Sequence, residues 1–370
     1  MNVVITGMSM RTCLGNLATS WSRLLDHQSG IALAQPFVQL PPYPLGLIGE
    51  NPANLVKLTR ELVTEAIADA GLRLPLSDCG VVIGSSRGGQ AEWEAYLEGK
   101  TLDWWSSLPQ IASVTVAKQI QTTGPVLAPM AACSTGVWAI AQGWELIQRG
   151  HCQRVIAGAI ETPITLMSLI GFAQMNALAT TGCYPFSVER EGLVLGEGGA
   201  VFILESADLA RSRGAKIYGQ VLGYGLNCDA YHVSAPEPTG IKAIACIKQC
   251  LQQSNLSPLD IDYIHAHGTG TRLNDAREAE IIKSLFGDKI AVSSTKGATG
   301  HTLGASATLG IAFSVMAMQE QQLPPCVGLQ QQDFALNLVT RTKQSVINNV
   351  LCFSFGFGGQ NGAIALSLCN

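Results

Sequence analysis

A cysteine, Cys133, stands at the beginning of a segment that has the apolar spacing of an α-helix. Apolar residues recur after it at helical intervals and the pattern ends at a glycine: Val137, Ile140, Ala141, Trp144, Ile147 and Gly150. The first turn of a helix favours negative charge, so the pKa of a thiol there can fall from about 8.5 into the reactive range. The same backbone amides could receive a developing oxyanion, and the small residues 134–136 would let another molecule approach. The alternative interpretation is a buried structural cysteine.

His265 and His267 form a second group with chemical potential, because they stand two residues apart on a predicted strand and share a face. Such a pair could be half of a metal site, but the nearby chain offers no clear third ligand, so we expect no metal. His267 also opens the loop His-Gly-Thr-Gly-Thr at 267–271, which places an imidazole and two hydroxyls at the end of a strand. A histidine that is satisfied beside a turn is the alternative.

Two further glycine-rich segments contain polar groups. Segment 294–306, STKGATGHTLGAS, holds Lys296 and His301 between a predicted strand and a predicted helix, and its small residues leave room for a ligand. Taken alone, it is typical of an ordinary surface turn. Segment 354–362, SFGFGGQNG, has the glycines of a dinucleotide fingerprint, but it precedes a strand and lacks the downstream acid, which excludes that reading.

The elements that must position these residues alternate between strand and helix. Continuous apolar strands are predicted at 3–6, 79–84, 155–159 and 200–204, and a helix is predicted at 54–70. Apolar strands of this kind between helices indicate an α/β protein whose sheet is covered on both faces.

One order of elements occurs twice along the chain. A helix at 54–70 leads through a turn into the strand at 79–84, and a helix at 241–253 leads in the same way into a strand at 261–269. Farther on, each half has a small-residue loop that opens a long apolar helix, and these two loops hold Cys133 and His301. Duplicated halves at 1–214 and 215–370 would bring the loops together at a pseudo-twofold centre. Chance similarity of βα units is the alternative.

Composition limits the classes of function. The 370 residues are 47% hydrophobic and 14% charged, against about 25% charged in average domains. This excludes a disordered chain and indicates a large buried fraction, with an oligomer among the expectations. The 23 Lys and Arg residues do not exceed the 27 Asp and Glu residues, so we expect no nucleic acid partner.

Targeting and redox signals point to a cytoplasmic protein. The chain does not open with a secretory signal pattern, and its most apolar run, 304–319, falls short of the roughly 20 residues that span a membrane. The eleven cysteines form no CxxC pair, so neither a disulfide framework nor a structural zinc site is expected.

Four motifs occur together in one order: ACSTG at 132–136, HAHGTGT at 265–271, STKGATGH at 294–301 and SFGFGG at 354–359. In that order and context the chain resembles the β-ketoacyl-acyl carrier protein synthases of the elongating (type I/II) kind. The resemblance covers nearly the whole chain and includes further stretches: GFAQMNAL at 171–178, REGLVLGEGGA at 190–200, CDAYHVSAPEP at 228–238 and NDAREAE at 274–280. Each motif alone would be weak evidence, whereas four in register are specific.

The resemblance implies a duplicated thiolase fold with five layers, α/β/α/β/α, usually as a homodimer, although a heterodimer with a related subunit is compatible with it. It implies a decarboxylative Claisen condensation in fatty acid or polyketide biosynthesis. Acyl carrier protein would be the partner, and no cofactor would be needed because phosphopantetheine carries the substrates.

Roles for the reacting residues follow from the same resemblance. Cys133 would hold the acyl group as a thioester. His267 and His301 would donate to the thioester oxygen as malonyl loses CO₂. Lys296 would add positive charge and pair with Glu278, which holds the histidine loop in place.

The resemblance also assigns roles around the reacting centre. Thr269 and Thr271 would hydrogen-bond the pantetheine arm, and the backbone N–H of Phe357 would join that of Cys133 in an oxyanion hole. Phe355 and Phe357 resemble the gate between the acyl pocket and the malonyl entrance, with two core aromatic residues as the alternative.

Other enzymes with a reactive cysteine fit less well. A chain-initiating synthase would use Cys, His and Asn, which His301 speaks against, and a thiolase would need a second cysteine where FGFGG stands. A cysteine hydrolase would not explain the four motifs. A non-catalytic partner subunit, like the chain-length factors, would lack the nucleophile, whereas Cys133, His267 and His301 are all present.

Overall fold

One hydrogen-bonded sheet runs through the protein, with one side built by the first part of the chain and the other side by the second. The computed structural model describes residues 2–101 and 103–369. The first side contains, from the middle outwards, β1 (Val3–Thr12), β8 (Gly198–Ser206), β7 (Arg154–Glu161), β5 (Gly80–Gly84) and β6 (Val126–Leu127). The second side contains, from the middle outwards, β9 (Gly219–Cys228), β16 (Gln360–Ser367), β15 (Asn349–Gly356), β10 (Tyr263–His265), β11 (Ala291–Ser293) and β13 (Asn337–Leu338).

The two sides repeat one pattern of strand directions. On each side the first three strands are antiparallel to their neighbours, and the strands beyond them are parallel. The sides meet where Val3–Ile5 of β1 pairs antiparallel with Gly219–Val221 of β9. The duplication expected from the sequence is therefore present in the topology. The predicted division between residues 214 and 215 falls between α7 (Ala207–Ser212) and β9, and as a domain boundary it stays a prediction.

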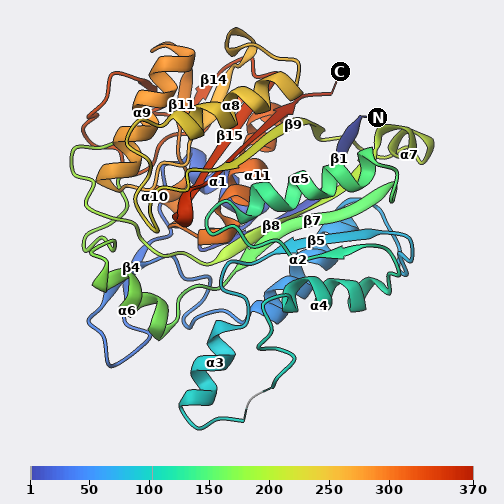
Figure 1. Cartoon of the computed structure of the whole chain (residues 1–370), viewed down its shortest axis with the longest axis horizontal. Coiled ribbons are helices and arrows are strands. Elements are labelled where there is room, and N and C mark those ends of the chain that lie inside the picture. Colours follow the sequence, from blue (N-terminus) through green and yellow to red (C-terminus); the bar gives the residue numbers. More distant parts are fainter. Residues whose placement is uncertain (1, 102, 370) are drawn as a thin grey trace.

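Helices form the remaining layers (Figure 1). They are α2 (Leu55–Asp69) and α4 (Ile111–Ile120) against the first side, α8 (Ile241–Gln253) and α9 (Arg272–Phe286) against the second, and α5 (Thr135–Gln148) and α11 (Ser306–Glu320) between the two sides. The expected order α/β/α/β/α is confirmed. The helix predicted at 241–253 matches α8.

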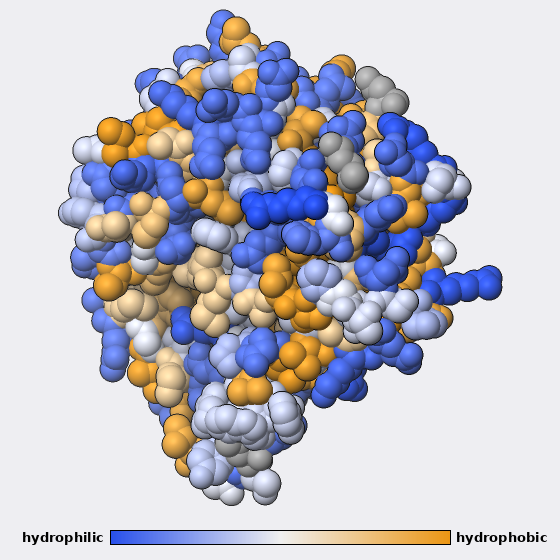
Figure 2. Space-filling model, turned by 45° about the vertical axis from the view of Figure 1, so that its right-hand side comes forward, coloured by the Kyte–Doolittle hydropathy of each residue, from blue (hydrophilic) through white to orange (hydrophobic). Residues whose placement is uncertain are grey.

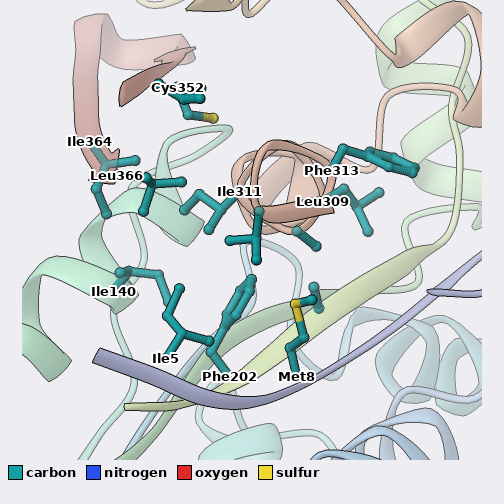
Figure 3. Packing of buried hydrophobic residues seen from close by; sticks show 14 of the residues in the cluster. Ile5, Met8, Ile140, Phe202, Leu309, Ile311, Phe313, Cys352, Ile364 and Leu366 are labelled. Carbon is teal, nitrogen blue, oxygen red and sulfur yellow. The ribbon is translucent and has the colours of Figure 1, made fainter. Parts of the chain in front are cut away.

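The alternation of strand side chains explains why both faces of each side are covered. Phe202 on β8 and Ile364 on β16 point into the central layer, where they pack around α11 (Figure 3). Their sequence neighbours point the other way: Ile203 packs with α2 and α4, and Ala363 packs with α8 and α9. Helix α11 is apolar on nearly all sides because it lies between both sheet faces. In the described part of the chain, no helix is long and apolar enough to cross a membrane.

The two central helices approach each other most closely near their first turns. A Cβ atom at Gly136 of α5 would lie 2.9 Å from the backbone nitrogen of Thr308 of α11. The absence of a side chain at this position therefore lets the two helix starts come together. The loops that precede these helices carry Cys133 and His301, so this contact positions the candidate chemistry.

Smaller elements complete the chain. They are β2 (Gly15–Asn16), α1 (Leu17–Leu25), β3 (Ala32–Ala34), β4 (Tyr43–Leu45), α3 (Gln90–Leu97), α6 (Leu166–Gln174), η1 (Pro258–Asp260), α10 (Lys296–Thr299), η2 (Leu303–Ala305), β12 (Gln322–Leu323), β14 (Lys343–Gln344) and η3 (Phe357–Gly359). Helix α3 projects from the lower end of the molecule (Figure 1). Figure 2 shows hydrophobic residues scattered among hydrophilic ones over the visible face.

The strands differ in length from the prediction. The strand expected at 3–6 extends to Thr12, because β1 continues its pairing with β8 as far as Arg11. The strand expected at 261–269 contains only Tyr263–His265. Beyond it the backbone leaves the sheet, and the amides of the next residues bind carboxylates instead.

We expect Gly136→Ala to lower the free energy of unfolding by about 1–3 kcal/mol, because the added methyl group overpacks the contact with α11. Urea denaturation measures the change. Gly171→Ala in α6 is the matched control, since a Cβ atom there meets nothing within 4 Å. The control should be stabilised by up to about 1 kcal/mol through helix propensity. Equal stability of both variants would contradict the close helix contact.

Candidate active site

Cys133 lies in a sharp turn directly before α5. The residue before it, Ala132, has a φ of 47°, in the left-handed region that L-residues rarely adopt. The Thr135 side chain holds this turn, because its hydroxyl accepts from the backbone N–H of Ala131 at 2.9 Å and donates to the carbonyl of Ala132 at 2.7 Å. A strained backbone that neighbouring groups hold in place is common at functional sites.

The C-terminal part of the chain closes over this turn. The hydroxyl of Ser354 on β15 donates to the carbonyl of Cys133 at 2.8 Å, and the Ser134 hydroxyl lies 2.6 Å from the carbonyl of Gln360. A Cβ atom at Gly356 would lie 3.0 Å from the backbone nitrogen of Cys133. The cysteine from the first half of the chain is thus fixed by backbone from the second half.

The environment of the Cys133 thiol is apolar. Its side chain belongs to a cluster of buried hydrophobic residues that contains Phe172, Leu193 and Leu303, and only 8% of the residue is exposed. Burial raises the pKa of the thiol to about 11, although the positive charge of Lys296 and the N–H of Phe357 act in the opposite direction. The fall in pKa that a helix start can produce is therefore not found in this closed arrangement, where burial is the largest influence on the thiol.

His267 and His301 lie side by side at the same cavity. Their ring centroids are 5.4 Å apart and the ring planes meet at 82°. Both are almost completely buried, and burial followed by the charge of Lys296 holds their pKa values well below the usual range. Both imidazoles are therefore neutral at pH 7.

Hydrogen-bond partners assign the positions of the imidazole protons. Nδ1 of His267 lies 3.4 Å from the Lys296 ammonium, which can only donate, so the ring proton of His267 sits on Nε2. Nδ1 of His301 lies 2.7 Å from the Ser306 hydroxyl, which can donate to it in the same way. The two rings can thus both present an Nε2–H group to a ligand.

Lys296 and Glu278 bind the histidine loop from two directions. The Lys296 ammonium donates to the carbonyl of His267, whereas the Glu278 carboxylate accepts from the backbone N–H groups of His267 at 2.6 Å and Gly268 at 2.7 Å. Within residues 2–101 and 103–369, no ion pair within 4.0 Å joins the two side chains. The pairing expected from the resemblance is therefore electrostatic rather than a close ion pair: each charge favours the ionised form of the other, while the loop backbone supplies the hydrogen-bond partners of both groups. Burial raises the pKa of Glu278 to about 7.

A second carboxylate, Asp275, was not predicted as part of the site. It accepts from the backbone N–H groups of Thr269 at 3.0 Å, Gly270 at 3.2 Å and Phe186 at 2.8 Å. Asp275 and Glu278 stand three residues apart on α9 and so share one face of the helix. Two acidic residues three positions apart, directly after a Gly-Thr loop, could have indicated this role in the sequence. Acidic residues with this spacing are, however, also typical of a solvent-exposed helix surface.

The site residues surround one cavity of about 320 Å³. Eight of the nine residues predicted from the sequence line this cavity: Cys133, Thr269, Thr271, His267, Glu278, His301, Phe355 and Phe357. The ninth, Lys296, lies behind His267. The hydroxyls of Thr269 and Thr271 are 2.9 Å apart. Phe355 packs edge-to-face on His267, with the ring centroids 5.9 Å apart. The ring centroids of Phe357 and Phe172 are 6.1 Å apart.

His265 faces away from this cavity. Its Nε2 atom lies 3.1 Å from the Thr295 hydroxyl, and its Nδ1 atom lies 3.8 Å from the Cys352 sulfur. Across the residues that the structure describes, no three His, Cys, Asp or Glu side chains cluster in a way that could hold a metal ion.

Comparisons with known proteins agree with this geometry. Residues 53–210 match the family model of the β-ketoacyl synthase N-terminal domain, and residues 218–330 match that of the C-terminal domain. The chain is 32% identical to 3-oxoacyl-[acyl-carrier-protein] synthase 2 of Staphylococcus aureus (strain COL), over 98% of this chain and 97% of the relative.

Solved structures with a similar fold are ketosynthases. A type II PKS ketosynthase in complex with its acyl-carrier protein, bound to the hexaketide, has a TM-score of 0.93 at 26% identity and covers 100% of this chain and 99% of that chain. A ketosynthase from Xenorhabdus doucetiae in complex with its chain length factor has a TM-score of 0.86 at 27% identity, covering 100% and 98%.

The fold and the site together are those of a condensing enzyme of the ketosynthase class. With both domain models matched in order, the chain belongs to the β-ketoacyl synthase family.

Because the pKa of Cys133 is raised to about 11, we expect its alkylation by iodoacetamide to increase about tenfold per pH unit between about pH 7 and 10, as the thiolate fraction rises. A small free thiol with its ordinary pKa of about 8.5 should level off within that range. Lys296→Met should slow the alkylation further, since it removes a charge that lowers the pKa. Mass spectrometry of the Cys133 peptide gives the rate, and a plateau below pH 9 would contradict the raised pKa.

Proposed function

We propose that the protein condenses an acyl group held on Cys133 with malonyl-acyl carrier protein to give 3-oxoacyl-acyl carrier protein. In the first half-reaction the Cys133 sulfur bonds to the acyl carbon, the pantetheine thioester breaks, and the thiol proton passes to the released pantetheine. In the second, malonyl loses CO₂, and the resulting carbanion attacks the acyl carbon as the Cys133 sulfur leaves. The observation that carries the proposal is the convergence of Cys133, His267 and His301 on one cavity.

The two histidines are proposed as donors to the charge that develops on decarboxylation. Loss of CO₂ moves the electron pair toward the malonyl thioester oxygen, and fixed donors at that oxygen lower the barrier. Neutral rings with a proton on Nε2 provide such donors without changing their own charge. Lys296 and Glu278 are proposed as positioning residues, because both bind the backbone at His267.

Backbone N–H groups are proposed as a second anion site. The amides of Cys133 and Phe357 would stabilise the tetrahedral oxyanion formed on the acyl group, and Gly356 allows the two segments to lie in contact. Phe357 is proposed as a gate that moves once Cys133 is acylated, because it packs on Phe172 beside the cysteine.

Phosphopantetheine of acyl carrier protein is proposed as the substrate carrier, bound by the hydroxyls of Thr269 and Thr271 at the cavity. The mechanism needs no separate cofactor, since decarboxylation itself generates the nucleophile. A ketosynthase of similar fold has been solved in complex with its acyl-carrier protein, which supports this partner. We also propose that the protein acts in the cytoplasm, where it would encounter acyl carrier protein.

Pairing with a second subunit of the same fold is also proposed. Strand β6 ends the first side of the sheet, and its side chains Val126 and Leu127 are 40% and 37% exposed. An edge strand with exposed apolar side chains is a surface on which another chain can pair. The relative solved with its chain length factor supports a related subunit as partner, and a second copy of this chain fits the same edge.

We expect Cys133→Ala to abolish acyl transfer and condensation but to retain malonyl decarboxylation, since both imidazole donors persist. His301→Ala should instead reduce decarboxylation by about 10²–10³-fold, the usual cost of losing one such donor. Release of CO₂ from malonyl-acyl carrier protein and the mass of the acylated chain measure the two steps. Cys369→Ala and His151→Ala, at positions that do not line the cavity, are matched controls. Normal decarboxylation by His301→Ala would refute its role.

We expect Leu127→Lys to weaken the pairing of subunits, because it places a charge on the exposed strand edge. Light scattering after size exclusion should show a smaller mass for this variant than for the unmodified chain. Leu259→Lys is the control, because Leu259 is 96% exposed and lies beside the other side of the sheet. An unchanged mass for Leu127→Lys would exclude β6 from the interface.

A further inference from the structure

A positive charge near the cavity has no role in the chemistry described above. Arg87 follows β5, and its guanidinium carbon lies 5.5 Å from the centre of the Phe172 ring. Among the described residues, no ion pair within 4.0 Å involves Arg87, and its hydrogen bonding is through its backbone. An arginine that only stacks on an aromatic ring still has all its N–H donors available.

The backbone that carries Arg87 is firmly held by a buried carboxylate. Glu161 accepts from the backbone N–H of Arg87 at 3.0 Å, from the backbone N–H of Ser86 at 2.7 Å and from the Ser85 hydroxyl at 2.7 Å. These bonds occupy both carboxylate oxygens of Glu161. The loop is therefore rigid at its base, while the nearest buried carboxylate is already satisfied and does not pair with the guanidinium.

Phe172 connects Arg87 with the nucleophile. The ring lines the same cavity as Cys133 and packs in the same hydrophobic cluster, with Phe357 on one side and Arg87 on another. The charge of Arg87 is close enough to oppose the burial that raises the pKa of the Cys133 thiol. Arg87 is not itself among the residues that line the cavity, so an acyl chain on Cys133 would approach it only by extending past the Phe172 ring.

Polar side chains also lie near Phe172. One helical turn before Phe172, Ser168 lies on the same face of α6. The Gln90 side chain amide is 3.2 Å from the Ser168 hydroxyl, 3.0 Å from the Thr165 hydroxyl and 2.7 Å from the Glu94 carboxylate. Polar side chains, including the Glu94 carboxylate, thus lie against α6 one turn from Phe172.

We propose that Arg87 determines acyl specificity: the far end of the acyl group on Cys133 meets the guanidinium, and the enzyme selects acyl groups that end in a carboxylate over saturated chains of the same length. This proposal rests on the proposed function. A carboxylate binds a guanidinium with two parallel charge-assisted hydrogen bonds. A hydrocarbon end would instead remove water from the guanidinium without supplying an acceptor, which is costly.

The test compares acyl groups of equal length on acyl carrier protein: adipoyl with hexanoyl, and suberoyl with octanoyl, with acetyl as a group too short to reach Arg87. Intact-mass spectrometry of the full chain measures the rate of acyl transfer to Cys133. We expect the carboxylated member of at least one pair to be transferred faster by the unmodified enzyme. In Arg87→Met this ratio should fall about 10- to 100-fold, the usual value of a charged hydrogen bond, and Arg87→Lys should retain part of it.

The controls separate this proposal from simpler roles of Arg87. If Arg87 only activates the thiol, Arg87→Met will slow acetyl and all longer groups equally and leave the ratio unchanged, which overturns the proposal. A ratio of one or less in the unmodified enzyme for both pairs also overturns it, while normal acetyl transfer leaves the proposed function intact. Absence of transfer of all five acyl groups in the unmodified enzyme would overturn the proposed function itself. The thermal midpoint of each variant reports whether it is folded.

Discussion

The site depends on one requirement: the buried backbone N–H groups of loop 267–271 must each find a hydrogen-bond acceptor. Loop 267–271 leaves the sheet after β10 and enters the interior, where unpaired N–H groups are costly. Asp275 and Glu278 accept from these amides, and Lys296 donates to the carbonyl of His267. These bonds fix the position of the His267 ring and of the hydroxyls of Thr269 and Thr271. They also fix the position of Phe355, because its ring packs on that of His267. The main role of the two carboxylates and the ammonium is thus to hold the loop in its conformation, and they influence the chemistry through the loop.

The cavity exists only where the two halves of the chain meet. Cys133 comes from the first half, both histidines come from the second, and the contact between Gly136 and Thr308 sets how closely their helices approach. Ser354 and Ser134 then join the cysteine turn to β15 and to Gln360, the first residue of β16. Because each half lacks groups that the other supplies, the duplicated fold forms a functional unit only as a whole.

Much of this could be read from the sequence, and what could not be read has identifiable physical causes. The repeat, the layers and the convergence of Cys133 with His301 follow from apolar patterning and motif order. The raised thiol pKa could not be predicted because the sequence shows a helix start but not the apolar shell around it. Spacing could not show that Lys296 and Glu278 bind the loop backbone from two directions instead of forming a close ion pair with each other. Arg87 escaped notice because its contact with Phe172 joins residues that are far apart in the chain.

The orientation of Lys296 determines the fate of a carbanion formed in the cavity. Its ammonium faces the carbonyl and Nδ1 of His267 instead of the cavity, and both imidazoles are neutral. Strong proton donors are therefore kept away from the carbon that has just lost CO₂. In the proposed reaction, the carbanion would then partition toward the acyl carbon on Cys133 rather than toward quenching by a proton, so that malonyl would not be wasted as acetyl. The same side chain that orders the loop would thereby protect the yield of carbon–carbon bond formation.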